Sequence, residues 1–232
     1  MSLAEVNLSR VVFIGRTFDE YLKIFNLTRE ELAGRKILDC PAGACSFTAI
    51  ANQNGIDVTA TDIAYYHPVN ELEKKGLEDI EHAIEYVEKL QNDYVWNYFK
   101  SIAELKQHRV QALTECVRDM KHSPARYVPA FLPELPFSDR EIELTLSAHL
   151  LFMYADKLDY DFHMKTIQEL MRVTQKEIRI FPLVDGLSRR YEYLDEILAF
   201  IHAQGWTTEE IKVPYEFLKG ANTMLKINRG KG

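Results

Sequence analysis

The sequence predicts an α/β fold, in which a mostly parallel sheet carries helices on both of its faces. Two apolar runs, Lys36–Cys40 and Asp57–Thr61, have the length and composition of buried strands. The segment between them, Ser46–Asn54, is compatible with a helix that ends at Gly55. The same alternation of strand, helix and strand returns in the second half of the chain, at Glu143–Ser147, Tyr160–Val173 and Glu177–Phe181. Such alternation is typical of parallel strands joined by crossover helices.

The two ends of the chain add further elements. Thr17-Phe18-Asp19-Glu20 and Thr28-Arg29-Glu30-Glu31 both match the capping box, in which a threonine and a glutamate satisfy free amides at a helix start. They predict two short helices before the first strand. Toward the other end, an amphipathic helix is expected over Arg189–Gln204, and Gly205 ends it. A hairpin is expected to follow, with strands Glu210–Phe217 and Thr223–Asn228 and a turn through Gly220-Ala221-Asn222.

The composition indicates a globular protein and disfavours several other classes. With 232 residues, of which 47% are hydrophobic, we expect one domain over residues 1–232. No apolar run reaches the roughly 20 residues that span a bilayer, so no membrane partner is expected. Met1–Glu5 lacks a secretory signal, which favours a cytoplasmic location. The net charge of −7 comes without a basic stripe, which disfavours nucleic acid as a partner.

The cysteines and the usual hydrolase motifs indicate no metal site. Cys40, Cys45 and Cys116 include no C-x-x-C pair. We interpret them as small buried side chains, with a redox pair between Cys40 and Cys45 as the alternative. The chain contains no H-E-x-x-H segment and no G-x-S-x-G segment, so metal-dependent hydrolysis and serine-type acyl transfer are disfavoured.

The turn after the first strand is the strongest indication of a ligand site. The first apolar run leads through Asp39 into a turn of small residues around Gly43, and the second ends at Asp62, 23 positions after Asp39. Small residues let a ligand approach the backbone, and an acidic side chain at the end of the second strand accepts hydrogen bonds from ribose hydroxyls. The turn holds one glycine and not the G-x-G-x-x-G that cradles a pyrophosphate. A ligand with a ribose and no phosphates therefore fits best.

These segments resemble the class I S-adenosylmethionine-dependent methyltransferases, whose first motif reads apolar-apolar-Asp-x-Gly-x-Gly-x-Gly. The resemblance continues through Leu135–Asp139 and Ile142–Phe152, which are similar to the family's turn and fourth strand. Later segments are similar to its next helix, its fifth strand and its closing hairpin, at Glu169–Thr174, Glu177–Pro182 and Phe217–Ile227. The ordered series covers about 35–62 and 127–228. It implies a doubly wound, Rossmann-like sheet of seven strands with an antiparallel C-terminal hairpin.

Some positions depart from the family's pattern. Pro41 and Cys45 stand where the first and third glycines are usual, and Phe131 and Leu132 replace an acidic residue. Proline removes one backbone donor from the turn. A non-catalytic or degenerate S-adenosylmethionine-binding module therefore stays open beside a methyltransferase, and an NAD-dependent oxidoreductase is a third, less favoured interpretation.

The resemblance implies S-adenosyl-L-methionine as the cofactor and assigns residues to its parts. Asp39 would orient the turn or the methionine ammonium, Asp62 would accept the ribose hydroxyls, and Arg16 would bind the methionine carboxylate. The backbone beside the methionine moiety would come from Cys40, Pro41, Ala42 and Gly43. Adenine would contact Ile63, Phe131 and Leu132, and the methyl group would lie above Ser147, Ala148 and His149.

Methyl transfer from a sulfonium depends mostly on positioning, so the sequence points to a base less firmly than to a cofactor site. His149 is the candidate base, because it follows the fourth strand and histidine titrates near neutral pH; shaping the pocket is the alternative role. The residues expected to line the substrate pocket are Tyr65, Tyr66, His67 and Tyr154; for the first three, packing that shields them from solvent is the alternative. A small-molecule acceptor is expected, because Ser147–Leu150 stands where amino-methylating nucleic-acid enzymes have a base-clamping N-P-P-Y segment.

Residues 64–126 form an insertion after the second strand, much longer than one crossover helix requires. Three apolar stripes at helical spacing predict that it is helical. They are Leu77, Ile80, Ile84, Val87 and Leu90; then Tyr94, Val95, Phe99, Ile102 and Leu105; then Val110, Leu113, Val117 and Met120. Because the insertion starts beside the predicted ribose site, one interpretation is a cap over the substrate mouth. Packing on the sheet edge and a dimerisation helix are the others.

Overall fold

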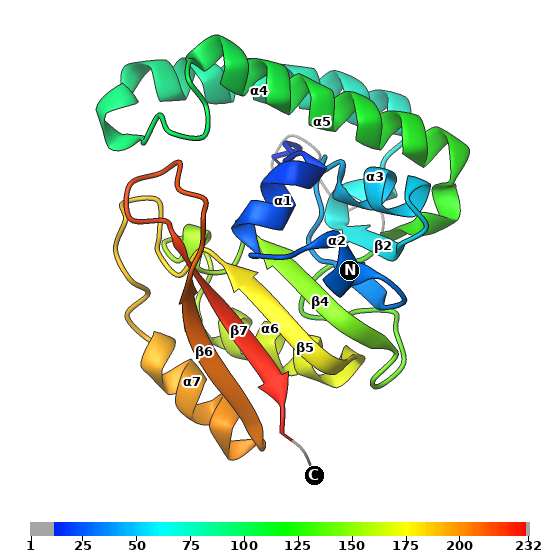
Figure 1. Cartoon of the computed structure of the whole chain (residues 1–232), viewed down its shortest axis with the longest axis vertical. Helices are drawn as coiled ribbons and strands as arrows, with labels where there is room; N and C mark the ends of the chain where they lie inside the picture. The colour runs from blue at the N-terminus through cyan, green and yellow to red at the C-terminus, as the bar shows by residue number, and fades with distance from the viewer. Residues whose placement is uncertain (1–11, 231–232) are drawn as a thin grey trace.

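A seven-stranded sheet forms the centre of the molecule, with the strand order β3-β2-β1-β4-β5-β7-β6 (Figure 1). The computed structural model describes residues 12–230, so Met1–Glu5, from which we expect no secretory signal, lie outside the described residues. From β3 to β5 neighbouring strands pair in parallel, whereas β7 is antiparallel to both β5 and β6. The predicted doubly wound sheet with its antiparallel hairpin is thus confirmed. The strands are β1 Lys36–Asp39, β2 Asp57–Asp62, β3 Tyr127–Pro129, β4 Ile142–Ala148, β5 Thr174–Phe181, β6 Trp206–Lys212 and β7 Thr223–Arg229.

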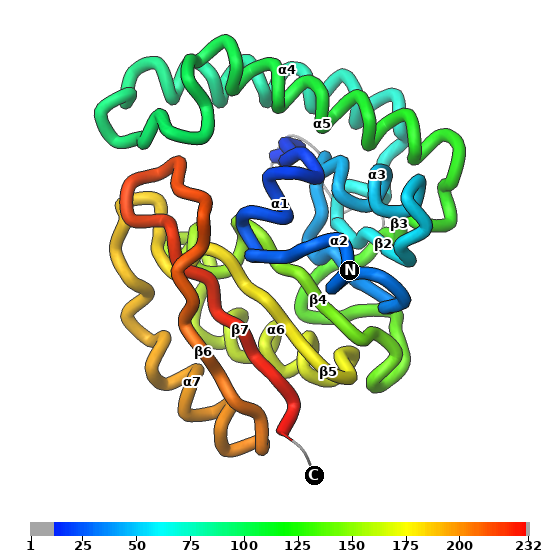
Figure 2. Tube along the Cα trace, viewed as in Figure 1, coloured from blue at the N-terminus to red at the C-terminus, as the bar shows by residue number. Residues whose placement is uncertain are grey.

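Helices cover both faces of the sheet and one of its edges. The first three pack against Ile37 and Leu144 on one face, while the last two pack against Leu38 and Ile178 on the other. The long helices α4 and α5 lie side by side across the edge where the parallel strands end (Figure 1, Figure 2). The helices are α1 Phe18–Ile24, α2 Arg29–Leu32, α3 Phe47–Gln53, α4 Val69–Lys89, α5 Ile102–His122, α6 Tyr160–Val173 and α7 Leu194–Ala203.

Elements with strong local signals form where the sequence predicts them. Thr17 and Thr28 each complete a capping box, with Glu20 and Glu31 as the reciprocal partners. Helix α6 has the predicted bounds, and the Asp159 side chain accepts the Phe162 amide at its start (2.8 Å). All three cysteines are buried free thiols, as predicted.

The second of the three predicted apolar stripes is wrong for Tyr94, Val95 and Phe99, whereas its last two members, Ile102 and Leu105, lie on α5. Residues 94–101 form an irregular connection with a turn and bends, between the short 3-10 helix Gln91–Asp93 and α5. The Val95 amide donates to the Phe217 carbonyl at 2.7 Å, and Tyr94 forms a β-bridge with Leu218. These long-range backbone bonds replace the bonds that a helix would make, while Phe99 is buried in the core through tertiary packing.

Two predicted boundaries near the end of the chain are also wrong. The last helix begins at Leu194 and not at Arg189, because Arg190 bridges Val184 and its side chain pairs with Glu210 (2.6 Å). The first hairpin strand spans Trp206–Lys212 and not Glu210–Phe217. Its continuation is diverted toward the insertion, where it meets the Tyr94 connection.

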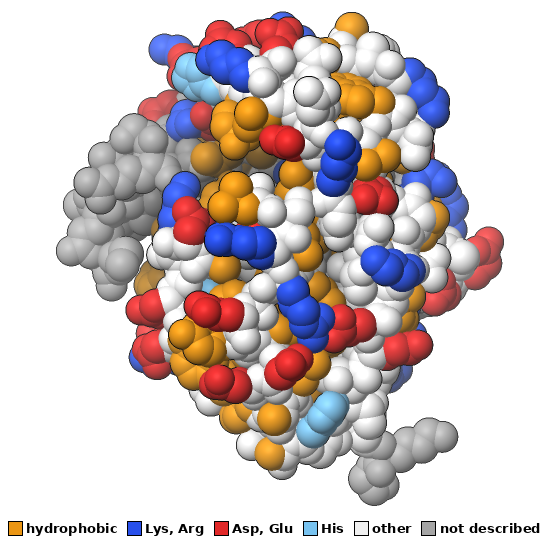
Figure 3. All heavy atoms as spheres, turned by 90° about the vertical axis from the view of Figure 1, so that its left-hand side faces the viewer, with side chains coloured by type: hydrophobic (Ala, Val, Ile, Leu, Met, Phe, Trp, Pro, Cys, Tyr) orange, Lys and Arg blue, Asp and Glu red, His pale blue; other side chains and the backbone are white. Residues whose placement is uncertain are grey.

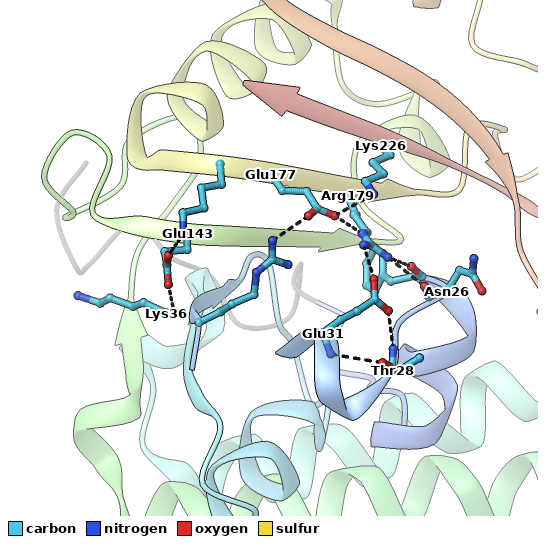
Figure 4. A network of polar contacts seen from close by, with 11 residues as sticks. Asn26, Thr28, Glu31, Lys36, Glu143, Glu177, Arg179 and Lys226 are labelled. Atoms are coloured by element: carbon cyan, nitrogen blue, oxygen red, sulfur yellow. Dashed lines mark hydrogen bonds and ion pairs between the residues drawn. The ribbon is translucent and has the colours of Figure 1, made fainter. Parts of the chain in front are cut away.

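A network of charged side chains fixes α2 and the turn before it to the sheet (Figure 4). Arg179 on β5 is 2% exposed; it pairs with Glu177 and donates to the backbone carbonyl of Asn26 at 3.0 Å. Glu177 also accepts from Arg35 at 3.0 Å, just before β1. Burial raises the pKa of Glu177, but Arg179 and Arg35 outweigh burial and leave that pKa below its ordinary value. The network therefore stabilises the packing of the chain's first helices.

Candidate active site

A cavity of about 1060 Å³ lies at the carboxyl ends of β1, β2 and β4, beneath the insertion. Both long helices contribute to its lining, α4 through residues such as Ile84 and Val87 and α5 through Leu105 and Arg109. The connection between β6 and β7 contributes Tyr215 and Phe217. Figure 3 shows one side of the molecule, on which hydrophobic side chains gather between the insertion at the top and the body below. This edge of a parallel sheet is where α/β proteins bind their ligands.

The turn after β1 is fixed by the carboxylate that ends β2. Gly43 has a φ of +55°, and its amide donates to Asp62 Oδ2 at 2.8 Å. The other oxygen of Asp62 accepts the Ala64 amide, also at 2.8 Å. A Cβ added to Gly43 would lie 3.0 Å from the carbonyl oxygen of Ile14, so both φ and space favour glycine here. The turn is therefore held in one shape against the cavity.

Asp62 lines the cavity and is 8% exposed. Burial raises the pKa of Asp62 above its ordinary value, although the amides of Ala64 and Gly43 act in the opposite direction. Each carboxylate oxygen has two acceptor sites, and each uses one of them on an amide. The carboxylate can therefore accept further hydrogen bonds from a ligand.

Asp39 lies behind the turn and does not line the cavity. It is 0% exposed, and its Oδ1 accepts the Tyr21 hydroxyl at 3.0 Å. Its Oδ2 has no hydrogen-bond partner among the described residues. Burial raises the pKa of Asp39 well above its ordinary value. Asp39 therefore ties the end of β1 to α1 through Tyr21.

The segment before α1 packs directly on the turn. Gly15 lies so close that an added Cβ would be 2.0 Å from the Ala44 carbonyl oxygen. The Arg16 amide donates to Cys45 Sγ at 3.2 Å, and the Arg16 carbonyl accepts the Ser46 amide at 3.0 Å. The Arg16 side chain lines the cavity, and its buried Nε has no partner among residues 12–230. A buried guanidinium nitrogen without a partner is costly unless a ligand satisfies it.

His149 follows β4 in a backbone conformation that is uncommon for a bulky residue. Its φ is +57°, its amide donates to the Phe181 carbonyl at 2.7 Å, and its ring packs edge-on against Phe181. The ring lines the cavity. Burial and the charges of Arg16 and Arg109 hold the pKa of His149 well below its ordinary value. The imidazole is therefore neutral near pH 7, and strained residues of this kind cluster at functional sites.

A buried ion pair joins the insertion to α1 at the cavity wall. Arg109 Nη1 donates to both oxygens of Glu20, at 2.8 and 3.0 Å, and these residues are 4% and 0% exposed. The Tyr215 hydroxyl donates to the same carboxylate at 3.1 Å. Burial raises the pKa of Glu20, but Arg109 outweighs burial and leaves that pKa below its ordinary value. Three distant parts of the chain thus meet on one carboxylate.

The insertion has two further attachments to the body of the molecule. At its far end, the Lys219 amide donates to the Asp93 carbonyl at 3.0 Å, and the rings of Tyr94 and Phe217 stack with centroids 4.6 Å apart. On α4, Asp79 accepts the Phe13 amide at 2.7 Å. The described insertion is therefore held at several points around the cavity.

Sequence comparison identifies a relative that matches almost the whole chain. The uncharacterized protein MJ0045 of Methanocaldococcus jannaschii is 36% identical over 225 residues, which cover 97% of this chain and 99% of that protein. The chain belongs to the MJ0045 family. No protein-family model matches it.

Solved structures show the fold of this member of the MJ0045 family. Magnesium protoporphyrin IX methyltransferase (ChlM) from Synechocystis PCC 6803, solved with bound S-adenosylmethionine, aligns with a TM-score of 0.50 at 14% identity. The alignment covers 92% of this chain and 78% of that one. A methyltransferase from Aquifex aeolicus aligns over 97% and 98% of the two chains, with 12% identity and a TM-score of 0.42. The alignment with ChlM, together with the strand order, confirms the class I methyltransferase fold predicted from the motifs.

Most of the site residues predicted for this MJ0045-family chain line the one cavity. They are Arg16, Cys40, Pro41, Ala42, Gly43, Asp62, Ile63, Phe131, Leu132, Ala148, His149 and Tyr154. Those that do not line it are Asp39, Ser147, Tyr65, Tyr66 and His67. The Tyr65 hydroxyl donates to the Gly43 carbonyl at 2.8 Å, so this ring supports the turn from behind. Ser147 is 1% exposed within β4.

Sequence reasoning missed Glu20, Arg109 and Tyr215. Glu20 has a local explanation as the partner of Thr17 in its capping box, which hid its second role. Arg109 and Tyr215 carry no local signal, because their partner lies far away along the chain.

Within residues 12–230, no cluster of His, Cys, Asp or Glu is arranged to hold a metal ion. No helix in the same range is long and apolar enough to cross a membrane.

Proposed function

We propose that this protein transfers a methyl group from S-adenosylmethionine to a small-molecule acceptor in the cytoplasm. The observation that carries this proposal is one cavity, in a methyltransferase fold, that brings the Gly43 turn, the Asp62 carboxylate and His149 together at the carboxyl edge of the sheet. We do not expect nucleic acid or a membrane to be the acceptor, since the chain carries a net charge of −7 and no basic stripe.

The residues present fit this cofactor. Asp62 has free acceptor capacity for ribose hydroxyls, and Gly43 leaves the turn's backbone open to close approach. Arg16 has a buried nitrogen that a methionine carboxylate would satisfy. The apolar side chains of Ile63, Phe131 and Leu132 suit contact with adenine.

The cofactor supplies an already activated methyl group, so the chain's own contribution is positioning and proton handling. His149, held neutral by its surroundings, would accept a proton or a hydrogen bond from the acceptor. The insertion 64–126 would act as a cap within the single domain, excluding water from the cavity. Its attachments through Arg109 and Phe217 support a cap that remains in contact with the rest of the molecule.

A second candidate function is a binding-only module. Both oxygens of Asp62 already accept backbone amides, and Pro41 removes one donor from the turn. These features would weaken binding relative to a turn with three glycines. They would not remove the cavity.

Isothermal titration calorimetry separates the candidates. S-adenosylmethionine and S-adenosylhomocysteine are expected to bind the wild-type chain, whereas NAD is not. Asp62→Ala should weaken binding by about 1.5–3 kcal/mol, the range for a lost hydrogen bond to a charged group. Binding of NAD in place of both would favour an oxidoreductase. No heat from either methionine derivative near 1 mM would refute the proposal.

Enzyme and binding module are then separated by a metabolite screen with radiolabelled S-adenosylmethionine. Transfer of label that is lost in His149→Ala supports catalysis, and the same screen in His149→Gln tests whether a hydrogen-bonding side chain suffices. Tight cofactor binding without transfer to any acceptor would favour the module.

Hydrogen exchange tests the cap. On binding of S-adenosylhomocysteine, residues 77–120 are expected to gain protection together with the turn 39–47. Protection of the turn alone would show that the insertion only packs on the sheet edge.

A further inference from the structure

The charges that line the cavity are not balanced. Its two described carboxylates are both engaged by the protein: Asp62 accepts two amides, and Asp79 accepts the Phe13 amide and pairs with Lys75. Neither carboxylate is free of protein partners, so neither is available only to a positively charged acceptor. A cationic acceptor, bound beside the sulfonium of the cofactor, would therefore find little compensation in this cavity.

The cationic side chains behave differently. Arg109 is paired with Glu20, but Arg16 and Lys157 form no ion pair with any acidic residue between positions 12 and 230. Arg16 lies against the Gly43 turn, because its backbone amide donates a hydrogen bond to Cys45 Sγ. Lys157, an exposed residue in the connection from β4 to α6, lies over the Tyr154 ring with its Nζ 5.4 Å from the ring centroid. It is therefore the cation left for an acceptor.

The rest of the cavity is apolar and aromatic. Tyr94 and Phe217 contribute their stacked pair, and Met153 and Phe162 lie on the side of the β4–α6 connection. Tyr86 on α4 lines the same cavity and is 59% exposed, a large exposure for an aromatic side chain. Exposed aromatic side chains beside a cavity are typical of a ligand site.

We infer that the acceptor is an apolar, aromatic molecule with a carboxylate, whose ring system enters the cavity while its carboxylate pairs with Lys157 at the rim. A singly charged group matches a single unpaired lysine. Amines are poor acceptors on this account, because they would add a positive charge beside Arg16 and Lys157. This inference rests on the proposed function, since it describes the second ligand of the same site.

Three probes with one ring system test the inference: 2-naphthoate, 2-naphthylmethanol and 2-naphthylmethylamine. Each is titrated by calorimetry into protein saturated with S-adenosylhomocysteine. We expect naphthoate to bind more tightly than the alcohol by up to about fivefold, the range of an exposed ion pair, and the amine to bind more weakly than the alcohol.

Charge reversal at Lys157 gives the decisive comparison. Lys157→Glu is expected to weaken naphthoate binding and to strengthen amine binding, whereas a damaged site would weaken both. The control Lys23→Glu makes the same change in net charge at an exposed residue outside the cavity, and it should leave all three affinities unchanged.

Equal affinities for the three probes, or no binding of any of them to the saturated protein, would overturn the inference. A parallel effect of Lys157→Glu on acid and amine would do the same. Because the first titration is with S-adenosylhomocysteine, failure of that step marks failure of the proposed function instead.

Discussion

Replacing Arg109 with methionine tests whether the buried ion pair fixes the insertion to the core. Methionine keeps an apolar stem of similar length but removes the guanidinium. Glu20 is 0% exposed, and after the change its carboxylate retains donors only from Thr17 and Tyr215 among the described residues. Removing one partner of a buried pair costs about 3–5 kcal/mol. We expect a loss of that size in the free energy of unfolding at neutral pH.

The pH dependence of this loss has a defined sign. In the wild type the folded pKa of Glu20 lies below its usual value of 4.5, so its contribution is present above that pH and is lost as the pH falls through the folded pKa. In Arg109→Met, burial acts without the guanidinium and raises the folded pKa. The variant therefore loses stability as the pH rises through that raised pKa, and its deficit against the wild type should be larger at pH 8 than at pH 5.

Urea unfolding followed by circular dichroism at both pH values measures the two deficits. Arg118→Met is the matched control, because Arg118 is exposed on the same helix and has no ion pair among the described residues; it should change stability by less than about 0.5 kcal/mol. A deficit below about 1 kcal/mol at pH 8, the value of an exposed pair, would refute the reasoning. So would a deficit that grows toward pH 5.

Three further outcomes are expected. Gly43→Ala should weaken S-adenosylhomocysteine binding about tenfold, because Gly43 has a positive φ and lies close to the Ile14 carbonyl. The control Gly55→Ala, also at positive φ but in open space, should leave this affinity unchanged. Equal calorimetric affinities in the two variants would contradict this expectation. Wild-type affinity for S-adenosylhomocysteine should fall as the pH is lowered from neutral toward the raised pKa of Asp62, because burial raises that pKa and protonation turns one acceptor site into a donor; a profile that stays flat while the protein is folded would argue against contact with Asp62. Arg179→Met should lower the free energy of unfolding by about 3–5 kcal/mol. It should not change the affinity for S-adenosylhomocysteine, since Arg179 does not line the cavity. A changed affinity in a variant that still folds would show that the Arg179 network influences the cavity.

Local signals in the sequence were sufficient for much of the fold. The capping boxes at Thr17 and Thr28 depend on residues three positions apart, and both form as predicted. The stripe through Tyr94 and Phe99 failed for the opposite reason. Its apolar side chains are buried or partly buried, but the Val95 amide donates to the distant Phe217 carbonyl and not to a carbonyl one helical turn earlier. Periodicity reports burial, and it does not report which backbone partner is chosen.

Some residues of the candidate site could likewise be predicted from local patterns in the sequence, and others could not. Gly43 and Asp62 follow directly from strand ends and a turn, and the structure joins them through one hydrogen bond. Tyr65 follows the same strand end, yet its hydroxyl turns back to the Gly43 carbonyl and away from the cavity. Glu20 and Arg109 meet across 89 positions, a pairing that a single sequence does not encode in any local pattern.

The junction of Glu20, Arg109 and Tyr215 also has a consequence for how the chain folds during synthesis. Glu20 and Tyr215 are 195 positions apart, so the carboxylate leaves the ribosome long before its last donor is made. The insertion likewise waits for a late partner, because Phe217 is translated after nearly every other element. Contacts of such long range are costly to close and form late. We expect a nascent chain that stops before residue 215 to keep the insertion's contacts through Arg109 and Asp79 but to lack those of Tyr215 and Phe217, so that the ligand cavity is completed only with the final hairpin.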